Sequence, residues 1–286
     1  MRLLVFGETG QLARALARRC PPGVEARFLG RLQVDLSEPT SCAAAVLDSG
    51  ADVVINAAAW TAVDLAEAEE AAATVANGAA PGAMARACAA KGIPFLHVST
   101  DYVFDGAGDA PYAPGHQTAP LNVYGRSKLA GEAAVRDSGA RHVILRTSWV
   151  FSAWGNNFLK TMLRLGRARE SLSIVSDQVG GPTPAAAIAD ALYAAAIAMT
   201  RGHTGGTYHF SGAPDVSWAE FARAIMAAAG LSCRIEDITT AGYPTAARRP
   251  LNSRLDCSTL DRDFGIRRPD WRKALEGILK ELETTS

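Results

Sequence analysis

The sequence predicts an α/β protein in which a doubly wound parallel sheet is joined to a smaller, discontinuous lobe. Two observations carry this prediction. Short apolar segments alternate with helical segments over about the first 150 residues, as expected of parallel strands that are joined by crossover helices. In addition, the first apolar segment, Leu3–Phe6, leads directly into a glycine-rich turn that is followed by helical sequence.

The glycine-rich turn has the form expected of a dinucleotide-binding site. The chain continues Gly7-Glu8-Thr9-Gly10-Gln11-Leu12-Ala13, a G-x-x-G-x-x-A spacing, and then enters a helix that is expected to end near Cys20. Glycines allow a tight turn and a close approach of the backbone to a pyrophosphate, and the helix N-terminus offers free N–H groups to the anion. The first lobe is therefore expected to be Rossmann-like.

The remaining strands of the sheet follow in order. They are expected near residues 26–29, 52–56, 94–99 and 142–146. The third strand runs into Ala57-Ala58-Ala59, whose small side chains let a ligand approach the backbone. Helical sequence spans roughly residues 66–91. Pro81 is expected to begin a second helix within this stretch, because the first turn of a helix tolerates proline.

Beyond Thr147 the alternation is less regular, which predicts a second lobe assembled from separate segments. Helices are expected at 157–166, 184–200, 217–229 and 270–283, a strand at 207–210, and loops at 202–206 and 242–252. Ser217 is a good N-cap for the third of these helices. We expect a dinucleotide-binding domain at residues 1–150, to which the helix near 184–201 returns. Residues 151–183 and 202–286 are expected to form mainly a substrate-binding lobe.

Two segments fit one active site. The first, Ser99-Thr100-Asp101-Tyr102-Val103-Phe104, follows the fourth strand, and ligands bind outside the carboxyl ends of such strands. The second is Tyr124-Gly125-Arg126-Ser127-Lys128, in which Tyr124 and Lys128 share one face of a helix. A Lys ammonium beside a phenol lowers the phenol pKa, which would make Tyr124 a usable proton donor. With Thr100 holding the substrate oxygen, such a site reduces a ketone, provided that a hydride carrier is present.

Composition excludes several other classes of protein. The 286-residue chain carries 29 basic and 29 acidic residues, whereas a nucleic-acid binder usually has a net basic footprint. No apolar run approaches the roughly 20 residues needed to span a bilayer, and no signal peptide is evident. The five cysteines are scattered and form no CxxC pair, which is typical of thiols in a reducing compartment. We therefore expect a cytoplasmic protein that binds neither nucleic acid nor membranes.

The chain resembles the extended short-chain dehydrogenases/reductases and, more narrowly, the dTDP-4-dehydrorhamnose reductase family. Seven ordered segments carry the resemblance, which is far more specific than a YxxxK match alone. Together they extend along nearly the whole chain: Gly7–Leu12, Asn56–Asp64, Ser99–Phe104, Pro120–Glu132, Arg146–Phe151, Asp177–Thr183 and Arg249–Ser253. The resemblance implies reduction of the 4-keto group of dTDP-4-dehydro-6-deoxy-L-mannose, giving dTDP-L-rhamnose.

The resemblance also implies roles for individual residues. Tyr124 would be the general acid, Lys128 its tuner and a ligand of the cofactor ribose, and Thr100 the hydroxyl that orients the ketone. Gly7, Thr9, Gly10, Gln11 and Leu12 would line the pyrophosphate, Asp35 and Leu36 would border the adenine, and Ala57, Ala58 and Ala59 would pass under the cofactor. The predicted substrate-binding residues are Val63, Thr100, Asp101, Tyr102, Trp149, Asn157 and Arg249. Trp149 and Val63 would equally suit a hydrophobic core, and His97 is expected to be structural.

Three departures from the family pattern bear on these roles. Glu8 stands in the glycine turn, where the family often has a neutral or basic residue, and the sequence offers no reason for it. Trp60 replaces a usual Tyr. The acidic residues through which some members hold a bridging magnesium ion are missing from 12–16 and 184–188. No metal site is therefore expected, and the chain should be a monomer or a weak homodimer.

The second strand bears on the choice of cofactor. It ends Leu29-Gly30-Arg31. An acid at this position favours NAD by binding the ribose hydroxyls, whereas Arg suits NADP. The sequence therefore favours NADPH, with Arg31 as a cofactor-binding residue, and leaves NADH open as a second cofactor.

Three other functions stay open at this point. A related 4-ketoreductase that makes another dTDP-deoxysugar would use the same hydride machinery. A non-catalytic, NADP-binding regulatory subunit of the same fold is a second alternative, although Thr100, Tyr124 and Lys128 are all present. An epimerase or dehydratase with tightly held NAD is the third. Dehydratases of this type generally need an acidic pair, which Thr100-Asp101-Tyr102 lacks.

Overall fold

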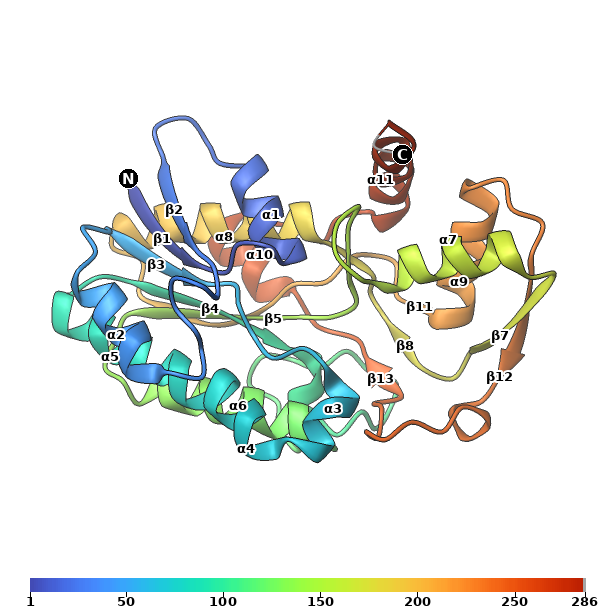
Figure 1. Cartoon of the computed structure of the whole chain (residues 1–286), viewed down its shortest axis with the longest axis horizontal. Coiled ribbons are helices and arrows are strands. Elements are labelled where there is room, and N and C mark those ends of the chain that lie inside the picture. Colours follow the sequence, from blue (N-terminus) through green and yellow to red (C-terminus); the bar gives the residue numbers. More distant parts are fainter. Residues whose placement is uncertain (285–286) are drawn as a thin grey trace.

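The computed structural model describes residues 1–284, which form a larger lobe around a parallel sheet and a smaller lobe beside it (Figure 1). The sheet has six strands in the order β2–β1–β3–β4–β5–β10, and every neighbouring pair is parallel. These strands are β1 (Arg2–Phe6), β2 (Glu25–Leu29), β3 (Val53–Asn56), β4 (Phe95–Thr100), β5 (His142–Thr147) and β10 (Gly205–His209). The predicted doubly wound sheet is thereby confirmed.

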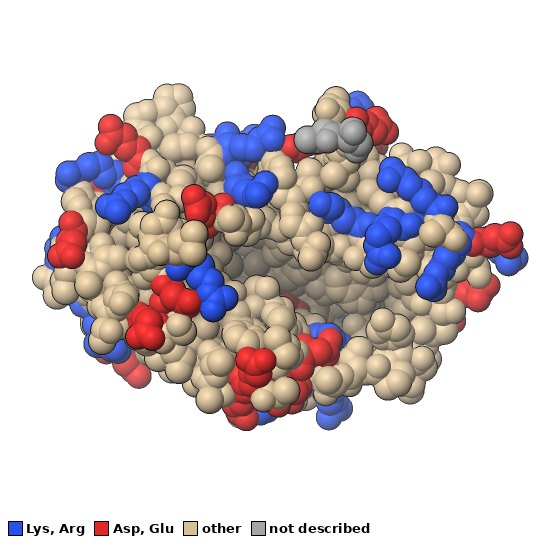
Figure 2. Space-filling view, viewed as in Figure 1, with Lys and Arg blue, Asp and Glu red and all other residues tan. Residues whose placement is uncertain are grey.

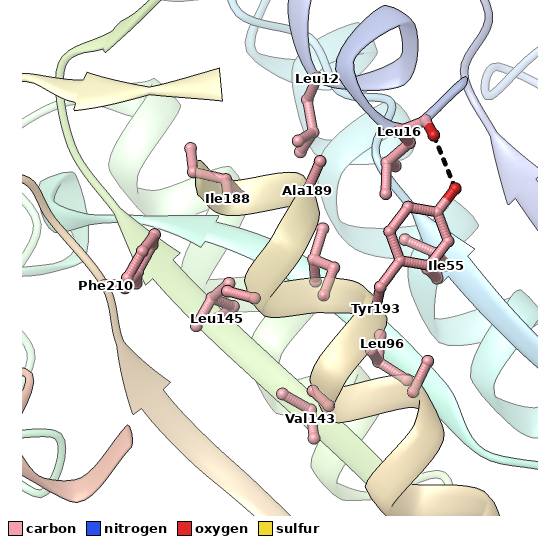
Figure 3. Close-up of a cluster of buried hydrophobic side chains, with 14 of the residues drawn as sticks. Leu12, Leu16, Ile55, Leu96, Val143, Leu145, Ile188, Ala189, Tyr193 and Phe210 are labelled. Atoms are coloured by element: carbon pink, nitrogen blue, oxygen red, sulfur yellow. Dashed lines mark hydrogen bonds between the residues drawn. The ribbon is translucent and has the colours of Figure 1, made fainter. Parts of the chain in front are cut away.

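One face of the sheet is covered by α1 (Gln11–Arg18) and α8 (Ala185–Thr200). Side chains alternate along a strand, so Leu3 and Val5 point to this face. Figure 3 shows how α8 fills the space between α1 and the strands. The buried Tyr193 hydroxyl donates a hydrogen bond to the Leu16 carbonyl at 2.7 Å. This bond satisfies the hydroxyl and ties α8 to α1.

The opposite face is covered by α2 (Pro39–Leu47), α5 (Ala80–Lys91) and α6 (Val123–Arg136). Leu4 and Phe6, the alternate residues of β1, point to this side and pack with Met84 and Val135. Helices therefore lie on both faces of the sheet, as the alternation of strand and helix signals predicts.

The order of the strands locates the cofactor crevice. β1 lies between β2 and β3. The chain therefore adds β2 on one side of β1 and β3 on the other, which reverses the strand order. Ligands bind at such switch points. Two backbone bonds extend the sheet beyond its strands here. The Gly7 N–H donates to the Leu29 carbonyl at 2.9 Å, and the Ala57 N–H donates to the Phe6 carbonyl at 3.0 Å. Figure 2 shows that the surface is hollowed between the two lobes.

The smaller lobe is built from α7 (Phe158–Ala168), α9 (Trp218–Ala228) and α11 (Trp271–Thr284), which surround a second hydrophobic core. Ser217 caps α9 as predicted: its hydroxyl accepts from the Glu220 N–H at 3.1 Å, and its own N–H donates to the Glu220 carboxylate at 2.7 Å. Short strands complete the lobe: β6 (Val150–Phe151), β7 (Ser171–Val175), β8 (Val179–Gly180), β9 (Thr183–Pro184), β11 (Val216–Ser217), β12 (Arg234–Ile238) and β13 (Asn252–Ser253).

Several elements differ from the sequence-based expectation. β10 is the sixth strand of the central sheet, although its residues fall in the range expected mainly for the substrate lobe, and α10 (Ser258–Phe264) packs beside it. The expected helix at 66–91 is divided into α3 (Val63–Ala68), α4 (Glu70–Thr74), a π-helix (Val75–Ala79) and α5, which Pro81 begins as predicted. Within residues 1–284, no helix is both long and apolar enough to cross a membrane.

Candidate active site

Thr100 stands at the carboxyl end of β4, where the chain enters a 3₁₀ turn (Asp101–Val103). Its buried hydroxyl donates to the Asp101 carboxylate at 3.0 Å and accepts from the Tyr102 N–H at 3.2 Å. Burial raises the pKa of Asp101 to about 6, against the opposing hydrogen bonds of Ser253 and Thr100. The strand end thus holds the Thr100 oxygen in one position.

Tyr124 lies in the first turn of α6 and reaches the same point. The Asn122 side chain caps this helix by accepting from the Gly125 N–H at 2.8 Å. The Tyr124 phenol interacts with the Thr100 side chain, and its ring meets the edge of the Tyr102 ring at a centroid distance of 5.5 Å. Two residues that are 24 positions apart in the chain are thereby brought into one site, as the sequence predicted.

The close approach of α6 to the 3₁₀ turn depends on Gly125. A Cβ at this position would lie 2.2 Å from the Tyr102 carbonyl oxygen, which is a backbone atom that cannot move aside.

We expect Gly125→Ala to lower the free energy of unfolding by about 1–3 kcal/mol, because overpacking displaces the backbone. The same variant should lower kcat, because the displacement separates Tyr124 from Thr100. Urea unfolding and turnover would measure both effects. The matched control is Gly277→Ala in α11, where nothing lies within 4 Å of the added carbon. An equal result for the two variants would contradict this prediction.

Lys128 is buried one turn after Tyr124. Its Nζ donates to the Val98 carbonyl at 2.7 Å and lies 3.4 Å from His97 Nε2. Asn56 lies on the other side of the ring, with its Nδ2 3.2 Å from His97 Nδ1. The Asn56 oxygen accepts from the Ala58 N–H, so the Asn56 amide nitrogen faces His97 Nδ1, and the tautomer of the ring sets which ring nitrogen carries the hydrogen. Burial lowers the pKa of Lys128 to about 8, although the charge of Glu132 opposes this.

The expected effect of Lys128 on Tyr124 is therefore wrong for this structure. The pKa of Tyr124 is raised, not lowered, because the phenol is buried, and only the interaction with Thr100 opposes the shift. The charge of Lys128 is not among the causes of this shift, and its amine donates to the Val98 carbonyl instead. The phenol consequently keeps its proton at neutral pH.

The π-helix holds the segment that follows β3. The buried Asn77 side chain accepts from the Trp60 N–H at 2.8 Å, and its amide nitrogen donates to the Trp60 carbonyl at 3.0 Å and to Ser127 Oγ at 2.9 Å. Ser127 in turn donates to the Tyr124 carbonyl at 2.8 Å. The predicted cofactor floor, Ala57-Ala58-Ala59, is thus linked to the helix of Tyr124. π-Helical turns frequently occur at functional sites.

The glycine turn fits a dinucleotide pyrophosphate. Gly7 has φ +114°, and a side chain there would contact the backbone of Ala57. Gly10 is the N-cap of α1, it provides no side-chain cap, and the space around it is open. The first N–H groups of α1 are therefore available to an anion. Leu12 is buried beneath the turn.

Two of the predicted adenosine-site residues contact each other. Arg31 Nε donates to Asp35 Oδ2 at 2.8 Å. Asp35 also accepts from the Ser37 N–H at 2.9 Å, and this bond together with Arg31 lowers its pKa. Leu36 is half-buried against the core beneath α2. These three residues therefore lie together, at the end of β2 and in the turns that follow it.

The predicted substrate residues line up along the lobe junction. Trp149 has φ +49°, which is rare for a bulky residue, and its ring stacks on Trp218 of α9 at a centroid distance of 3.6 Å. Arg249 donates to the Asp64 carboxylate at 2.5 Å, and its charge opposes the rise that burial causes in the pKa of Tyr102. Val63, half-buried, is the first residue of α3.

The Asn157 side chain is engaged within the protein. Its oxygen caps α7 by accepting from the Lys160 N–H at 3.1 Å. Its amide nitrogen donates to Gln11 Oε1 at 2.8 Å and to the Ser152 carbonyl at 2.9 Å. A substrate contact by Asn157 stays a prediction, because this side chain already joins the glycine turn to the smaller lobe.

Sequence reasoning missed four residues that contribute to the site. Asn56 contacts His97, which lies beside Lys128, Asn77 binds the Trp60 backbone, and Trp218 stacks on Trp149. His97 was expected to be structural; it is buried in β4, but it also contacts Lys128. A polar residue inside an otherwise apolar strand was the signal in that case. Nothing in the sequence brings Trp218 to Trp149, because the stacking spans two lobes. Among residues 1–284, no group of His, Cys, Asp and Glu could hold a metal ion.

Comparison with known proteins assigns the family. The sequence model of the RmlD substrate binding domain matches residues 1–284. The chain belongs to this RmlD family. It is 44% identical to a dTDP-4-dehydrorhamnose reductase of Sinorhizobium fredii, over 98% of this chain and 97% of the relative. It is 46% identical to a Burkholderia thailandensis protein of the same name, over 99% of both chains.

Solved structures of the RmlD family have the same fold. The chain matches a Bacillus anthracis dTDP-4-dehydrorhamnose reductase, solved in complex with NADP, with a TM-score of 0.92 at 33% identity. The match covers 98% of this chain and 99% of that one. The predicted resemblance is confirmed over the whole described chain.

Proposed function

We propose that the protein reduces the 4-keto group of dTDP-4-dehydro-6-deoxy-L-mannose to give dTDP-L-rhamnose. NADPH is the hydride donor, and NADH is also accepted. The position of the Tyr124 phenol beside the Thr100 hydroxyl, at the crevice end of β4, carries the chemical part of this proposal. The relatives named dTDP-4-dehydrorhamnose reductase, which match nearly the whole chain, support the choice of substrate.

Tyr124 and Thr100 divide the work at the ketone oxygen. Asp101 and the Tyr102 N–H fix the position of the Thr100 oxygen, and rotation of the hydroxyl hydrogen away from Asp101 would let Thr100 donate to the ketone oxygen. Tyr124 then transfers its phenolic proton to that oxygen as the carbinol forms. Its raised pKa keeps the proton in place until the oxygen becomes basic. The nicotinamide, when bound, supplies the hydride to the carbonyl carbon.

The predicted cofactor residues fit this role. Gly7 and Gly10 leave the backbone open to the pyrophosphate, and Ala57-Ala58-Ala59 provides a floor of small side chains. Lys128 would bind the nicotinamide ribose with the N–H groups that Val98 does not use. On the substrate side, we assign the dTDP-sugar to Val63, Asp101, Tyr102, Trp149 and Arg249.

The pH profile provides a test of the role of Lys128. We expect kcat/KM to fall about tenfold per pH unit above pH 8, because Lys128 loses its charge as pH rises through its pKa of about 8, and kcat/KM reports groups of the free enzyme. Tyr124 stays protonated over this range, so it does not contribute. The Lys128→Met variant should be less active at pH 7 and should lack this decline. A flat wild-type profile from about pH 7 to 9.5 would contradict the assignment.

The function itself is tested by the decay of NADPH absorbance with purified protein. The substrate is freshly epimerised dTDP-4-keto-6-deoxy-L-sugar, and the unepimerised D-sugar is the control. Decay with the L-sugar only, with dTDP-L-rhamnose identified by NMR, is the expected result. Tight NADPH binding without decay on either sugar would instead favour another deoxysugar or a regulatory subunit.

We also propose a cytoplasmic location and a monomeric or weakly dimeric state. All five cysteines are free thiols, as is usual in a reducing compartment. Gel filtration with light scattering at several protein concentrations would test the assembly state.

A further inference from the structure

The turn after β2 is where dinucleotide-binding proteins recognise the adenosine ribose. In such folds an acidic residue about 20 positions beyond the glycine turn binds the ribose hydroxyls, and a nearby Arg accommodates a 2′-phosphate instead. Gly30 occupies this position here, directly after β2. The strand itself therefore supplies no acid.

An acid reaches this position from the glycine turn. Because the Gly7 N–H donates to the Leu29 carbonyl at 2.9 Å, the next residue of each segment, Glu8 and Gly30, also lie side by side. The Glu8 carboxylate lies over Gly30 so closely that a Cβ on Gly30 would be 2.2 Å from Glu8 Oε2. Gly30 therefore makes room for the carboxylate.

The Glu8 carboxylate is exposed and available to a ligand. Within residues 1–284, no basic side chain forms an ion pair with it. Arg31, the cation that could receive a phosphate, is bound to Asp35 at 2.8 Å. Asp35 remains ionised at neutral pH because the Ser37 N–H and Arg31 lower its pKa. Glu8, Arg31 and Asp35 together leave a net negative charge at the adenosine end of the crevice.

We propose that Glu8 weakens the preference for NADPH and lets the site accept NADH as well, by accepting hydrogen bonds from the 2′- and 3′-hydroxyls of NADH and by repelling the 2′-phosphate of NADPH. This inference rests on the proposed function, since it requires a dinucleotide in the crevice. It gives Glu8 a role that the sequence alone did not suggest. It also changes the expectation drawn from Arg31, because the cation that would favour NADPH is shared with Asp35 and opposed by Glu8.

The test is the binding of NADPH and NADH to the sugar-free protein, measured by calorimetry. For Glu8→Gln we expect the Kd of NADPH to fall about tenfold, because a like charge near the 2′-phosphate is removed. The Kd of NADH should rise about threefold, because a neutral amide is a weaker acceptor than a carboxylate. Adenosine 2′,5′-bisphosphate and 5′-AMP, used as fragments without the nicotinamide, should show the same opposite shifts.

Arg31→Gln is the matched control at the same end of the crevice. It removes a positive charge, so it should weaken NADPH and leave NADH within about twofold. An unchanged ratio of the two dissociation constants in Glu8→Gln would overturn the inference while leaving the reductase proposal intact. Failure of wild-type protein to bind either dinucleotide would overturn both. Salt screens both the repulsion by Glu8 and the attraction by Arg31. In Glu8→Gln only the attraction remains, so raised salt should lower the affinity for NADPH. In the wild type the two effects oppose each other, so the affinity for NADPH should not fall, and this difference would support the inference.

Discussion

Tyr124→Phe is expected to lower kcat by about 10²–10⁴-fold, which is the usual contribution of a positioned proton donor. Phe fills the same space and keeps the ring contact with Tyr102, so the site should retain its shape. Only the phenolic hydroxyl beside Thr100 is lost. Asp101, which accepts the Thr100 hydrogen bond, has a pKa of about 6 and is therefore mainly ionised above that pH, so it does not replace the phenol as proton donor at pH 7 and above.

The dissociation constant of NADPH serves as the internal control for this variant. It should change by less than about threefold, since the proton is transferred only in the transition state. Steady-state kinetics with the L-keto-sugar, together with calorimetry for NADPH, separate the two effects. Turnover near the wild-type level would remove Tyr124 from the chemistry. Loss of NADPH binding together with turnover would indicate damage to the crevice instead.

The central sheet could be predicted because its signals are local. The predicted range of each of the first five strands overlaps the observed strand. Gly7 and Gly10 mark the first turn by their spacing alone. Burial on both faces explains why β1, β3, β4 and β5 are mainly apolar, whereas the edge strand β2 alternates exposed and partly buried residues.

The small strands of the second lobe could not be predicted in the same way. β7 and β12 pair in parallel although about sixty residues separate them, and β8 pairs with both β11 and β13. Strands of two residues have no hydrophobic period to detect. The sequence predicted the strand at 207–210 but not its place in the central sheet, since a parallel strand is assigned to a sheet only by its partner, here β5.

The site was predicted in its residue types more than in its electrostatics. Thr100, Tyr124 and Lys128 do come together, because strand ends and helix faces fix their positions. The pKa of Tyr124 was predicted in the wrong direction, since burial and the Val98 carbonyl are tertiary features. Glu8 shows the same limit: its carboxylate gains a possible role only because β2 and the glycine turn lie side by side.

Arg146→Met is expected to lower the free energy of unfolding by about 3 kcal/mol, the lower end of the cost of breaking a buried ion pair, because the partly exposed Arg136 still binds the Glu132 carboxylate at 3.1 Å. Arg146 makes two hydrogen bonds to the buried Glu132 carboxylate, at 2.8 and 2.6 Å. Ser99 donates to the same carboxylate at 2.6 Å. Since Ser99 precedes Thr100 and Glu132 follows Lys128 by one turn, this cluster also holds α6 against β4 at the active site.

Urea unfolding of Arg146→Met would measure this effect against Arg223→Met, which removes an exposed pair with Asp237 and should cost at most about 1 kcal/mol. The double variant Glu132→Leu/Arg146→Met should recover part of the loss, because no buried carboxylate then lacks its partner.

The dependence of stability on acid provides an independent check of the ion pair. Burial alone would raise the pKa of Glu132, but the hydrogen bonds and charge of Arg146 hold it below its ordinary value. The stabilisation is therefore complete above the unfolded-state pKa of about 4.3 and is lost as pH falls through the lower native value. In Arg146→Met, the part of the free energy of unfolding that depends on acid should be lost. If this variant were as stable and as acid-sensitive as the wild type, the ion pair would not fix α6 to the sheet.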